Sequence, residues 1–317
     1  MMKFGIIMDP ISNIKVSKDS NLKILLKAQE RNYEIFYMEL QDLYVEKGNP
    51  YALAKKIIVK QNKESWFEFK ETTRIPLSDL DVILMRKDPP FDIDYIYATY
   101  ILDLAELKGT FVANKPQSLR DCNEKVYTSW FPKLTPETII TSNPYLIKDF
   151  HKTHKNIILK PLDGMGGASI FKVTENDPNL SVIIETLTNH GSAYCMAQEF
   201  IPDITLGDKR IIIINGEVMP YVLARIPAKG ETRGNIAAGG TGVVQEISEI
   251  DLNLAKEIAP ILKQKGLFWV GLDVIGNKLT EINVTCPTCI VEIEQATGFS
   301  IADKILDSLE NKIKIKK

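Results

Sequence analysis

Three oxygen-bearing side chains, Asp273, Glu281 and Asn283, stand close together near the carboxyl end of the sequence. They lie in two largely apolar segments that flank a turn at residues 276–278, and this pattern predicts a β-hairpin. A two-residue turn would mix acidic and apolar residues on both faces. A three-residue turn places Asp273 opposite Glu281 with Asn283 on the same face, so we expect that register.

Two carboxylates that face each other across a hairpin repel unless a cation lies between them. Carboxylate and amide oxygens from few protein residues suit Mg²⁺, which shares its coordination sphere with water and nucleotide phosphates. The hairpin therefore predicts a magnesium site, at which Mn²⁺ is a possible substitute. A solvated hairpin face without metal is the alternative.

A glycine-rich loop at residues 163–168 lies between two predicted strands, 157–162 and 169–173. It lacks the Gly-Lys-Ser/Thr of a P-loop, and no helix follows it as in the dinucleotide fingerprint. Glycines let backbone N–H groups approach an anion, so the loop is predicted to cover phosphates. Lys160 enters the loop on the preceding strand and is expected to reach the same phosphates. A plain turn remains the alternative.

A second predicted hairpin, with strands 210–214 and 217–226, turns at Asn215-Gly216. A two-residue turn pairs Arg210 with Tyr221 and puts Arg225 on the same face. Two guanidinium groups on one face suit carboxylate recognition, because each binds a carboxylate through two hydrogen bonds. Two exposed cross-strand arginines are the alternative.

The next segment, residues 230–242, contains five glycines in thirteen residues. Such a composition predicts neither a stable helix nor a strand. It indicates either a disordered loop or a lid that closes over substrate, in which case Arg233 would arrive on closure.

Cys286 and Cys289 form a Cys-x-x-Cys pair near a predicted helix start, where a thiolate would be favoured. No second such pair is present, and the three histidines lie far away in the sequence. The pair is therefore interpreted as a turn after the metal strand, and redox chemistry is the alternative.

The first third of the chain alternates predicted strands with predicted helices, which favours an open, mainly parallel sheet. The strands are 4–8, 35–40, 81–85 and 111–113, and the helices are 19–32, with Ser17 and Asp19 at its start, and 93–108. Residues 118–121 resemble a capping box that starts another helix. Beyond them the chain is rich in hairpins, and a helix from Ser248 to Lys265 is predicted between two of them. The expected fold class is α/β, with domains at residues 1–122 and 123–317.

The 317 residues carry a net charge of −2, so no extended basic surface for nucleic acid is expected. No apolar run approaches the ~20 residues that a membrane span needs, and no secretory signal is evident. A cytoplasmic protein with reduced cysteines is expected.

Six sequence strings together resemble the bacterial glutathione synthetases of the ATP-grasp superfamily. They are Met8–Pro10, Leu84–Pro90, Asn114–Asp121, Leu159–Ala168, Gly230–Asn235 and Leu279–Val284. The resemblance spans nearly the whole chain. It implies a Rossmann-like amino-terminal domain, a central lobe and a carboxyl-terminal lobe, with ATP between the two lobes. It also implies ATP-dependent joining of γ-glutamylcysteine to glycine, and a homotetramer.

The resemblance implies a role for each matching residue. By this resemblance, the residues that contact the nucleotide are Lys125, Lys160, Gly164, Gly166, Gly167, Glu199, Phe200, Ile201 and Asp208. Those that contact the substrate or the acyl phosphate are Arg210, Arg225 and Arg233. The metal ligands are Asp273, Glu281 and Asn283. Another ATP-grasp ligase, such as a dipeptide or peptide-tail glutamate ligase, would share the ATP site. A non-catalytic ATP-binding regulator on the same fold is a further alternative.

Overall fold

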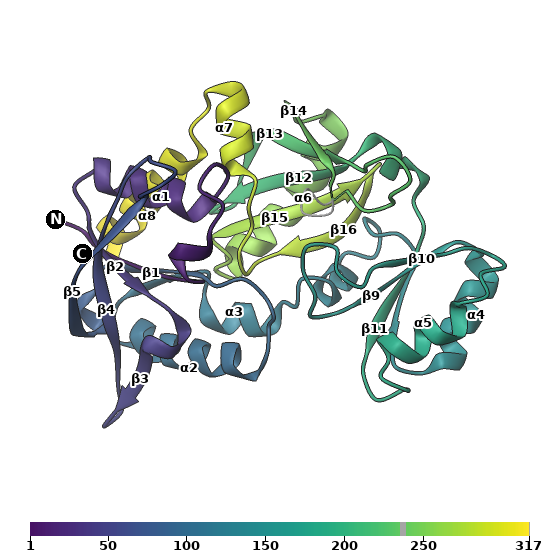
Figure 1. Cartoon of the computed structure of the whole chain (residues 1–317), viewed down its shortest axis with the longest axis horizontal. Coiled ribbons are helices and arrows are strands. Elements are labelled where there is room, and N and C mark those ends of the chain that lie inside the picture. The colour runs from purple at the N-terminus through teal and green to yellow at the C-terminus, as the bar shows by residue number, and fades with distance from the viewer. Residues whose placement is uncertain (235–238, 317) are drawn as a thin grey trace.

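The structure, a computed structural model, describes residues 1–234 and 239–316. Its strands form three sheets, each with its own helices (Figure 1). Among these described residues, five short 3₁₀ helices connect the elements: Ile11–Asn13, Leu40–Asp42, Leu77–Asp79, Val126–Trp130 and Pro202–Leu206.

The centre of the amino-terminal sheet is parallel, in the order β2-β1-β6-β7. These strands are β1 (Lys3–Met8), β2 (Glu34–Met38), β6 (Val82–Arg86) and β7 (Phe111–Ala113), and all four were predicted. Neighbouring β1 side chains point to opposite faces, so Ile6 packs in the core beside α1 (Ser20–Glu30) and Ile7 in the core beside α2 (Ile93–Leu107). Both helices match the prediction.

Three further strands make this sheet mixed, and the prediction of a mainly parallel sheet is to that extent wrong. The strands β3 (Leu43–Glu46), β4 (Asn49–Val59) and β5 (Phe67–Pro76) are antiparallel and extend the edge beyond β2. The residues of β5 are largely exposed and polar, so they lack the buried face that identifies a strand in sequence.

The helix expected to start at residues 118–121 begins earlier, as α3 (Pro116–Asp121). Ser118 lies inside α3 rather than at its cap, and its hydroxyl donates to the carbonyl of Lys265. The capping-box prediction is therefore wrong, because Pro116 provides the first helical position instead.

The central lobe is a four-stranded sheet in the order β10-β9-β11-β8, covered by two helices. Its elements are β8 (Thr138–Thr141), α4 (Pro144–His154), β9 (Ile157–Pro161), β10 (Phe171–Val173), α5 (Leu180–Leu187) and β11 (Cys195–Glu199). The lobe has a separate small core, in which Ile147 of α4 and Ile184 of α5 pack on Leu159.

The carboxyl-terminal lobe is a five-stranded antiparallel sheet in the order β14-β13-β12-β15-β16. Its strands are β12 (Asp208–Ile214), β13 (Glu217–Ile226), β14 (Thr241–Glu246), β15 (Trp269–Ile275) and β16 (Lys278–Asn283). The helix α6 (Glu249–Gln264), capped by Ser248 as predicted, packs with Ile211 and Leu272 on one face. The helices α7 (Ile290–Thr297) and α8 (Ile301–Lys316) share the core of Ile212 on the other.

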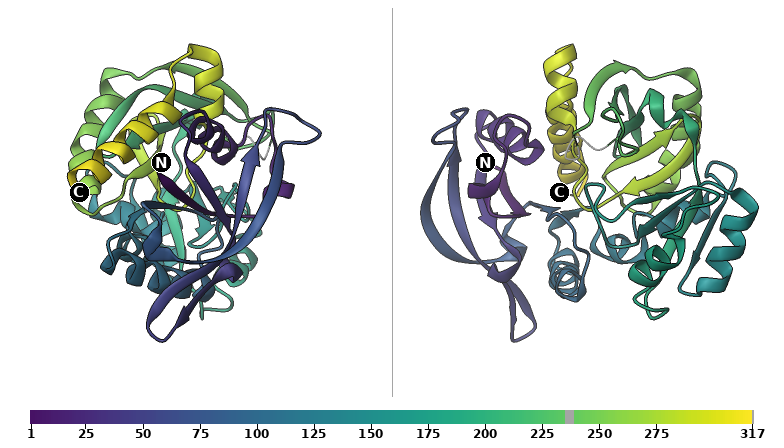
Figure 2. Two further views of the ribbon diagram at one scale, coloured as in Figure 1. Left: turned by 90° about the vertical axis from the view of Figure 1, so that its left-hand side faces the viewer. Right: turned by 45° about the vertical axis from the view of Figure 1, so that its right-hand side comes forward.

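The end of the chain returns to the amino-terminal sheet. In Figures 1 and 2 helix α8 (yellow) lies beside α1 and the purple strands. Arg31, just after α1, pairs with Asp303, Asp307 and Glu310 of α8. Asn114, which follows β7, donates to the carbonyls of Trp269 and Val284, so the two ends of the chain are fixed to each other.

Within the described part of the chain, no helix has the length and apolar character needed to cross a membrane.

Candidate active site

A cavity of about 520 Å³ lies between the three parts of the molecule. It is lined by the start of α1, by the loop at 164–168, by the end of β11 and by strands of the carboxyl-terminal sheet. Every residue predicted for nucleotide, substrate or metal lines it: Lys125, Lys160, Gly164, Gly166, Gly167, Glu199, Phe200, Ile201, Asp208, Arg210, Arg225, Arg233, Asp273, Glu281 and Asn283. The structure thus brings together side chains spread over some 160 residues of sequence.

The last hairpin has the predicted pairing but a different turn. Ile275 pairs with Lys278, so Gly276-Asn277 is a two-residue turn and the expected three-residue turn is wrong. A bulge at Thr280 supplies the extra residue, and Asp273 is opposite Glu281 after it. The sequence pattern fixed which face is buried, but it could not distinguish a longer turn from a bulge.

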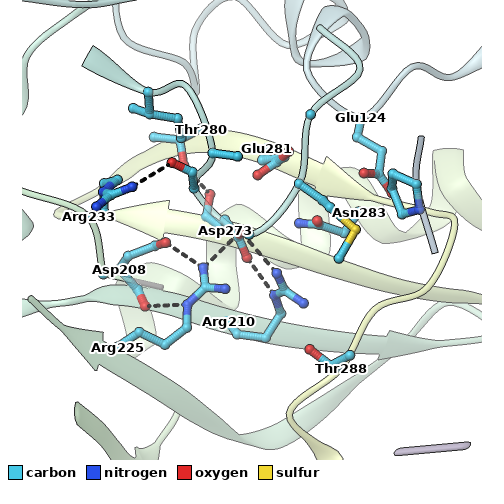
Figure 3. A pocket seen from close by; sticks show the side chains of 18 of the residues that line it. Glu124, Asp208, Arg210, Arg225, Arg233, Asp273, Thr280, Glu281, Asn283 and Thr288 are labelled. Atoms are coloured by element: carbon cyan, nitrogen blue, oxygen red, sulfur yellow. Dashed lines mark hydrogen bonds and ion pairs between the residues drawn. The ribbon is translucent and has the colours of Figure 1, made fainter. Parts of the chain in front are cut away.

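Asp273 is bound by two buried arginines, as Figure 3 shows. Arg210 donates through Nε to Oδ1 at 2.5 Å and through Nη2 to Oδ2 at 3.1 Å, and Arg225 Nη2 lies 2.8 Å from Oδ2. Burial opposes ionisation of Asp273, but the two guanidinium groups outweigh it and hold the pKa of this carboxyl well below its usual range. Asp273 is therefore a fixed anion.

The arginines come from the predicted hairpin in a shifted register. An irregularity in the pairing between Ile211 and Ile213 places Arg210 opposite Leu223, so the predicted pairing with Tyr221 is wrong. The shift is two residues, which preserves the face, and Arg225 lies on the same face as predicted. The alternative of exposed arginines is excluded, because Arg210 and Arg225 are 5% and 4% exposed.

Asp208 is opposite Arg225 in the sheet and accepts a hydrogen bond from its guanidinium. Burial raises the pKa of Asp208 to about 6; Arg225 works against this rise and Asp273 adds to it. Its Oδ1 atom is buried and has no hydrogen-bond partner. Because Asp208 lines the cavity, this unpaired oxygen is a candidate acceptor for a ligand hydroxyl.

Lys160 is buried on β9 and donates to the carbonyl of Thr280, the bulged residue, at 3.2 Å. The bulge therefore positions both the acidic pair and a lysine from the other lobe. Burial lowers the pKa of Lys160 to about 8, with the neighbouring charge of Lys125 adding to the effect and Glu281 opposing it.

Lys125 connects the glycine loop to the last hairpin, β15–β16. Its ammonium donates to the carbonyl of Gly164 at 2.7 Å and lies 3.0 Å from Glu281. Burial works against its charge, but Glu281 and Glu124 outweigh burial and raise the pKa of Lys125. Lys125 thus remains a cation beside the first glycine of the loop.

The glycine loop contacts the start of the glycine-rich segment 230–242. Gly166 and Gly167 have φ values of +64° and +81°, a region that favours glycine, and this explains their presence in the loop. Arg233 donates to the carbonyl of Gly167 at 3.1 Å and to Glu231 at 2.6 Å. Residues 235–238 of the predicted lid lie outside the described residues.

The end of the glycine-rich segment forms a strand, contrary to the prediction. Thr241 and Gly242 belong to β14 and pair with Ile226 and Arg225 of β13. The neighbouring strand compensates for the conformational cost of glycine, which is a tertiary effect that composition does not report.

The hairpin acids fit a divalent cation. Asp273, Glu281 and Asn283 offer carboxylate and amide oxygens on one face, as Mg²⁺ requires. Asp273 has about four lone-pair sites and receives three donors, so about one site is left for a metal. The side chain of Glu281 is 22% exposed and is the more open ligand. In the described chain no three His, Cys, Asp or Glu residues form a potential metal cluster, and Asn283 is not one of these residue types.

The two late cysteines are free thiols. Cys289 precedes α7, as expected for a turn before a helix, with a left-handed φ of +83°. Burial raises the pKa of both Cys286 and Cys289, so the expected preference for thiolate is wrong. Helix start and sequence spacing do not reveal burial, which is the dominant influence on a thiol here.

Glu124 was missed in the sequence. Its Oε1 atom accepts hydrogen bonds from the backbone N–H groups of Val284 and Thr285 and from the Thr285 hydroxyl, and it lines the cavity. Burial raises its pKa, and Glu281 adds to the effect. In the sequence, the position of Glu124 next to the predicted nucleotide-binding Lys125 was the feature that could have indicated it.

Two family models match the chain. The model described as "Prokaryotic glutathione synthetase, N-terminal domain" covers residues 2–120, and "Prokaryotic glutathione synthetase, ATP-grasp domain" covers residues 124–298. The chain is 61% identical over 314 residues to a glutathione synthetase of Vibrio parahaemolyticus, with 99% of both chains covered. It is 58% identical over 313 residues to that of Escherichia coli K12, again with 99% of each covered.

Solved structures of more distant proteins share the fold. D-cycloserine synthetase DcsG superposes with a TM-score of 0.69 at 11% identity, with 98% of this chain and 99% of that chain covered. The ATP-grasp ligase PsnB, complexed with minimal precursor, Mg and ADP, superposes with a TM-score of 0.62 at 16% identity over 98% of each chain.

Proposed function

We propose how the cavity side chains bind the nucleotide, the metal and the substrate in this chain, which belongs to the prokaryotic glutathione synthetase family and is an ATP-dependent carboxylate–amine ligase. The observation that carries the proposal is the convergence of three anion-binding elements on one cavity with a metal-compatible hairpin. These elements are the glycine loop with its two lysines, the buried arginine pair, and Arg233 at the start of the lid.

The nucleotide is proposed to lie between the central and carboxyl-terminal lobes. Lys125 and Lys160 approach from different elements and would both contact phosphates, beside the N–H groups of Gly164, Gly166 and Gly167. The adenine would lie at the end of β11 against residues 199–201. The unpartnered Oδ1 atom of Asp208 would accept a ribose hydroxyl.

Magnesium is proposed to be held by Asp273, Glu281 and Asn283, whose side chains share one face of the last hairpin and line the cavity. When bound, it would neutralise the phosphate oxygens on which negative charge develops. Lys125 forms an ion pair with Glu281, so a bound cation would share this carboxylate with the Lys125 ammonium. Mn²⁺, with similar oxygen ligands, is expected to substitute.

The reaction is proposed to proceed in two steps. The cysteinyl carboxylate of γ-glutamylcysteine attacks the γ-phosphorus of ATP, giving an acyl phosphate and ADP. The glycine amine then attacks the acyl carbon, and phosphate leaves. The protein supplies no nucleophile; its contribution is positioning and stabilisation of developing negative charge.

The arginines would provide that stabilisation. Arg210 uses Nε and Nη2 on Asp273, which leaves its Nη1 donors for the substrate carboxylate or the tetrahedral oxyanion. Because Asp273 and the sheet fix the arginine pair, the donors need not reorganise during reaction. Arg233 would complete the site from the lid.

Domains at residues 1–122 and 123–317 are part of the same proposal, supported by family models that end at 120 and begin at 124. A cytoplasmic homotetramer is also proposed, and light scattering would then give a mass near four times the 35.7 kDa of one chain.

Positional isotope exchange tests the acyl-phosphate step. ATP labelled with ¹⁸O at the β,γ-bridge should scramble its label when γ-glutamylcysteine is present and glycine is absent. Scrambling that also occurs without the dipeptide, or that requires glycine, would rule out this order of steps.

A further inference from the structure

Glu124 lines the cavity but has no role in the assignments above. It belongs to a segment that covers β16, the edge strand of its sheet, whose outward N–H groups need partners from outside that sheet. The amide of Leu279 donates to the carbonyl of Leu134, and the amide of Ile282 donates to the carbonyl of Glu124, each at 2.8 Å. Residues 124–134 thus take the place of a further strand.

Beyond the end of β16, the side chain of Glu124 continues this pairing. Its Oε1 atom accepts hydrogen bonds from the backbone N–H groups of Val284 and Thr285 at 2.8 and 2.9 Å, and from the Thr285 hydroxyl at 2.8 Å. Val284 and Thr285 are 1% and 4% exposed, so water is a poor substitute for these bonds. The carboxylate of Glu124 therefore fixes the backbone that follows the hairpin.

These bonds enclose the proposed metal ligand Asn283, which Figure 3 shows near Glu124. The residue before Asn283 is held by the carbonyl of Glu124, and the residue after it by the carboxylate of Glu124. The Asn283 side chain donates through Nδ2 to the carbonyl of Gly271 at 3.3 Å, which leaves its Oδ1 atom for a cation. The backbone and the side chain of this ligand are therefore both fixed.

The neighbours of Glu124 join the same hairpin to the glycine loop. Asn123 donates through Nδ2 to the carbonyl of Leu162 at 3.1 Å, just before the loop. Lys125 contacts both the carbonyl of Gly164 and the carboxylate of Glu281. Three consecutive residues thus hold the loop and the hairpin at a fixed separation.

We propose that Glu124 is a positioning residue for the metal, which holds Asn283 in register with Glu281 without itself binding the cation. The inference rests on the proposed magnesium site. Mg²⁺ requires nearly ideal octahedral geometry, so a ligand that shifts is costly, and the loss of a partner that orients a metal ligand typically lowers metal affinity by about 10- to 100-fold. Asp273 needs no such partner, because two arginines already fix it.

The test measures how much a metal ion strengthens nucleotide binding in the absence of turnover. Isothermal titration calorimetry gives the dissociation constant of ADP with excess Mn²⁺ and with EDTA, and the ratio of the two constants is the gain due to the metal. In Glu124→Ala this gain should fall by about 10-fold or more, while the affinity for ADP in EDTA stays within about twofold of the original. In Glu124→Gln the gain should stay within about threefold, because the amide oxygen still accepts the same three bonds. Glu257→Ala, an exposed change on α6, should leave the gain intact.

The outcomes separate the inference from the proposed metal site. A gain that survives in Glu124→Ala, even with weaker binding overall, overturns the inference and leaves the metal site standing. Equal losses in Glu124→Gln and Glu124→Ala also overturn it, because they would make Glu124 a ligand or a necessary charge instead. If Glu124→Ala does not fold, Thr285→Val, which removes one of the three bonds, should still lower the gain, and an unchanged gain there overturns the inference. Absence of any gain in the unchanged protein would contradict the metal site itself, and the inference with it.

Discussion

Asp273 lies opposite Glu281 in the last hairpin because Thr280 bulges out of β16, two paired residues after the two-residue turn. The bulge has two consequences. It returns both carboxylates to the cavity face, and it presents the Thr280 carbonyl to Lys160 of the other lobe. The hairpin and the central lobe are thus connected at the proposed metal site.

Replacing Glu281 with glutamine should lower turnover by about 10²-fold or more and raise the Mg²⁺ concentration needed for half-maximal rate, because a neutral amide is a weaker metal ligand. Steady-state rates over a magnesium titration measure both effects. Glu217→Gln, an exposed change on β13, is the control. Normal metal-dependent turnover in Glu281→Gln would remove the metal assignment.

Arg225→Ala should cost about 3–5 kcal/mol of unfolding free energy, because it leaves the buried carboxylates of Asp208 and Asp273 short of a cation. Urea unfolding followed by circular dichroism gives the value. Arg74→Ala on β5, whose partner Glu46 is also exposed, should change stability little. A loss no larger than that of Arg74→Ala would mean that the buried network does not depend on Arg225.

Catalytic efficiency with ATP should fall as pH rises through about 8. Burial lowers the pKa of Lys160 in the free protein to about 8, and only the protonated amine attracts phosphate, so deprotonation above this pH weakens ATP binding. Lys160→Arg keeps its charge to higher pH and should lose this limb of the profile. A pH profile of kcat/KM for ATP that is identical in both proteins would contradict the role of Lys160.

Arg233→Ala should reduce kcat by about 10²-fold, because it removes a cation from the site and the hydrogen bond from Arg233 to the carbonyl of Gly167. The exposed neighbour Lys229 offers a matched control, and Lys229→Ala should be near normal. Rapid-quench measurement of a single turnover separates chemistry from product release. An unchanged single-turnover rate would show that Arg233 has no part in the chemical step.

The sequence pattern predicted which side chains share a face more accurately than it predicted the turns and the cross-strand pairs. The arginine pair and the acidic pair were both placed on the correct faces, because a buried face constrains register to the correct parity. The turn at Gly276 and the partner of Arg210 were wrong, since a bulge or a two-residue shift preserves parity and leaves no trace in the pattern. Local composition likewise could not reveal that Thr241 would find a partner strand.

Burial was the property least accessible from sequence. The thiols of Cys286 and Cys289 and the carboxyl of Glu124 have raised pKa values because of neighbours that are distant in the chain. The strand β5 was missed for the opposite reason, since its largely exposed residues show no apolar period.

The most direct test of the whole account is phosphate release from ATP with Mg²⁺, γ-glutamylcysteine and glycine, omitting each component in turn. The account predicts steady release only with all four present, and formation of glutathione in equal amount. Release with pairs of D-alanine but not with γ-glutamylcysteine and glycine would contradict it.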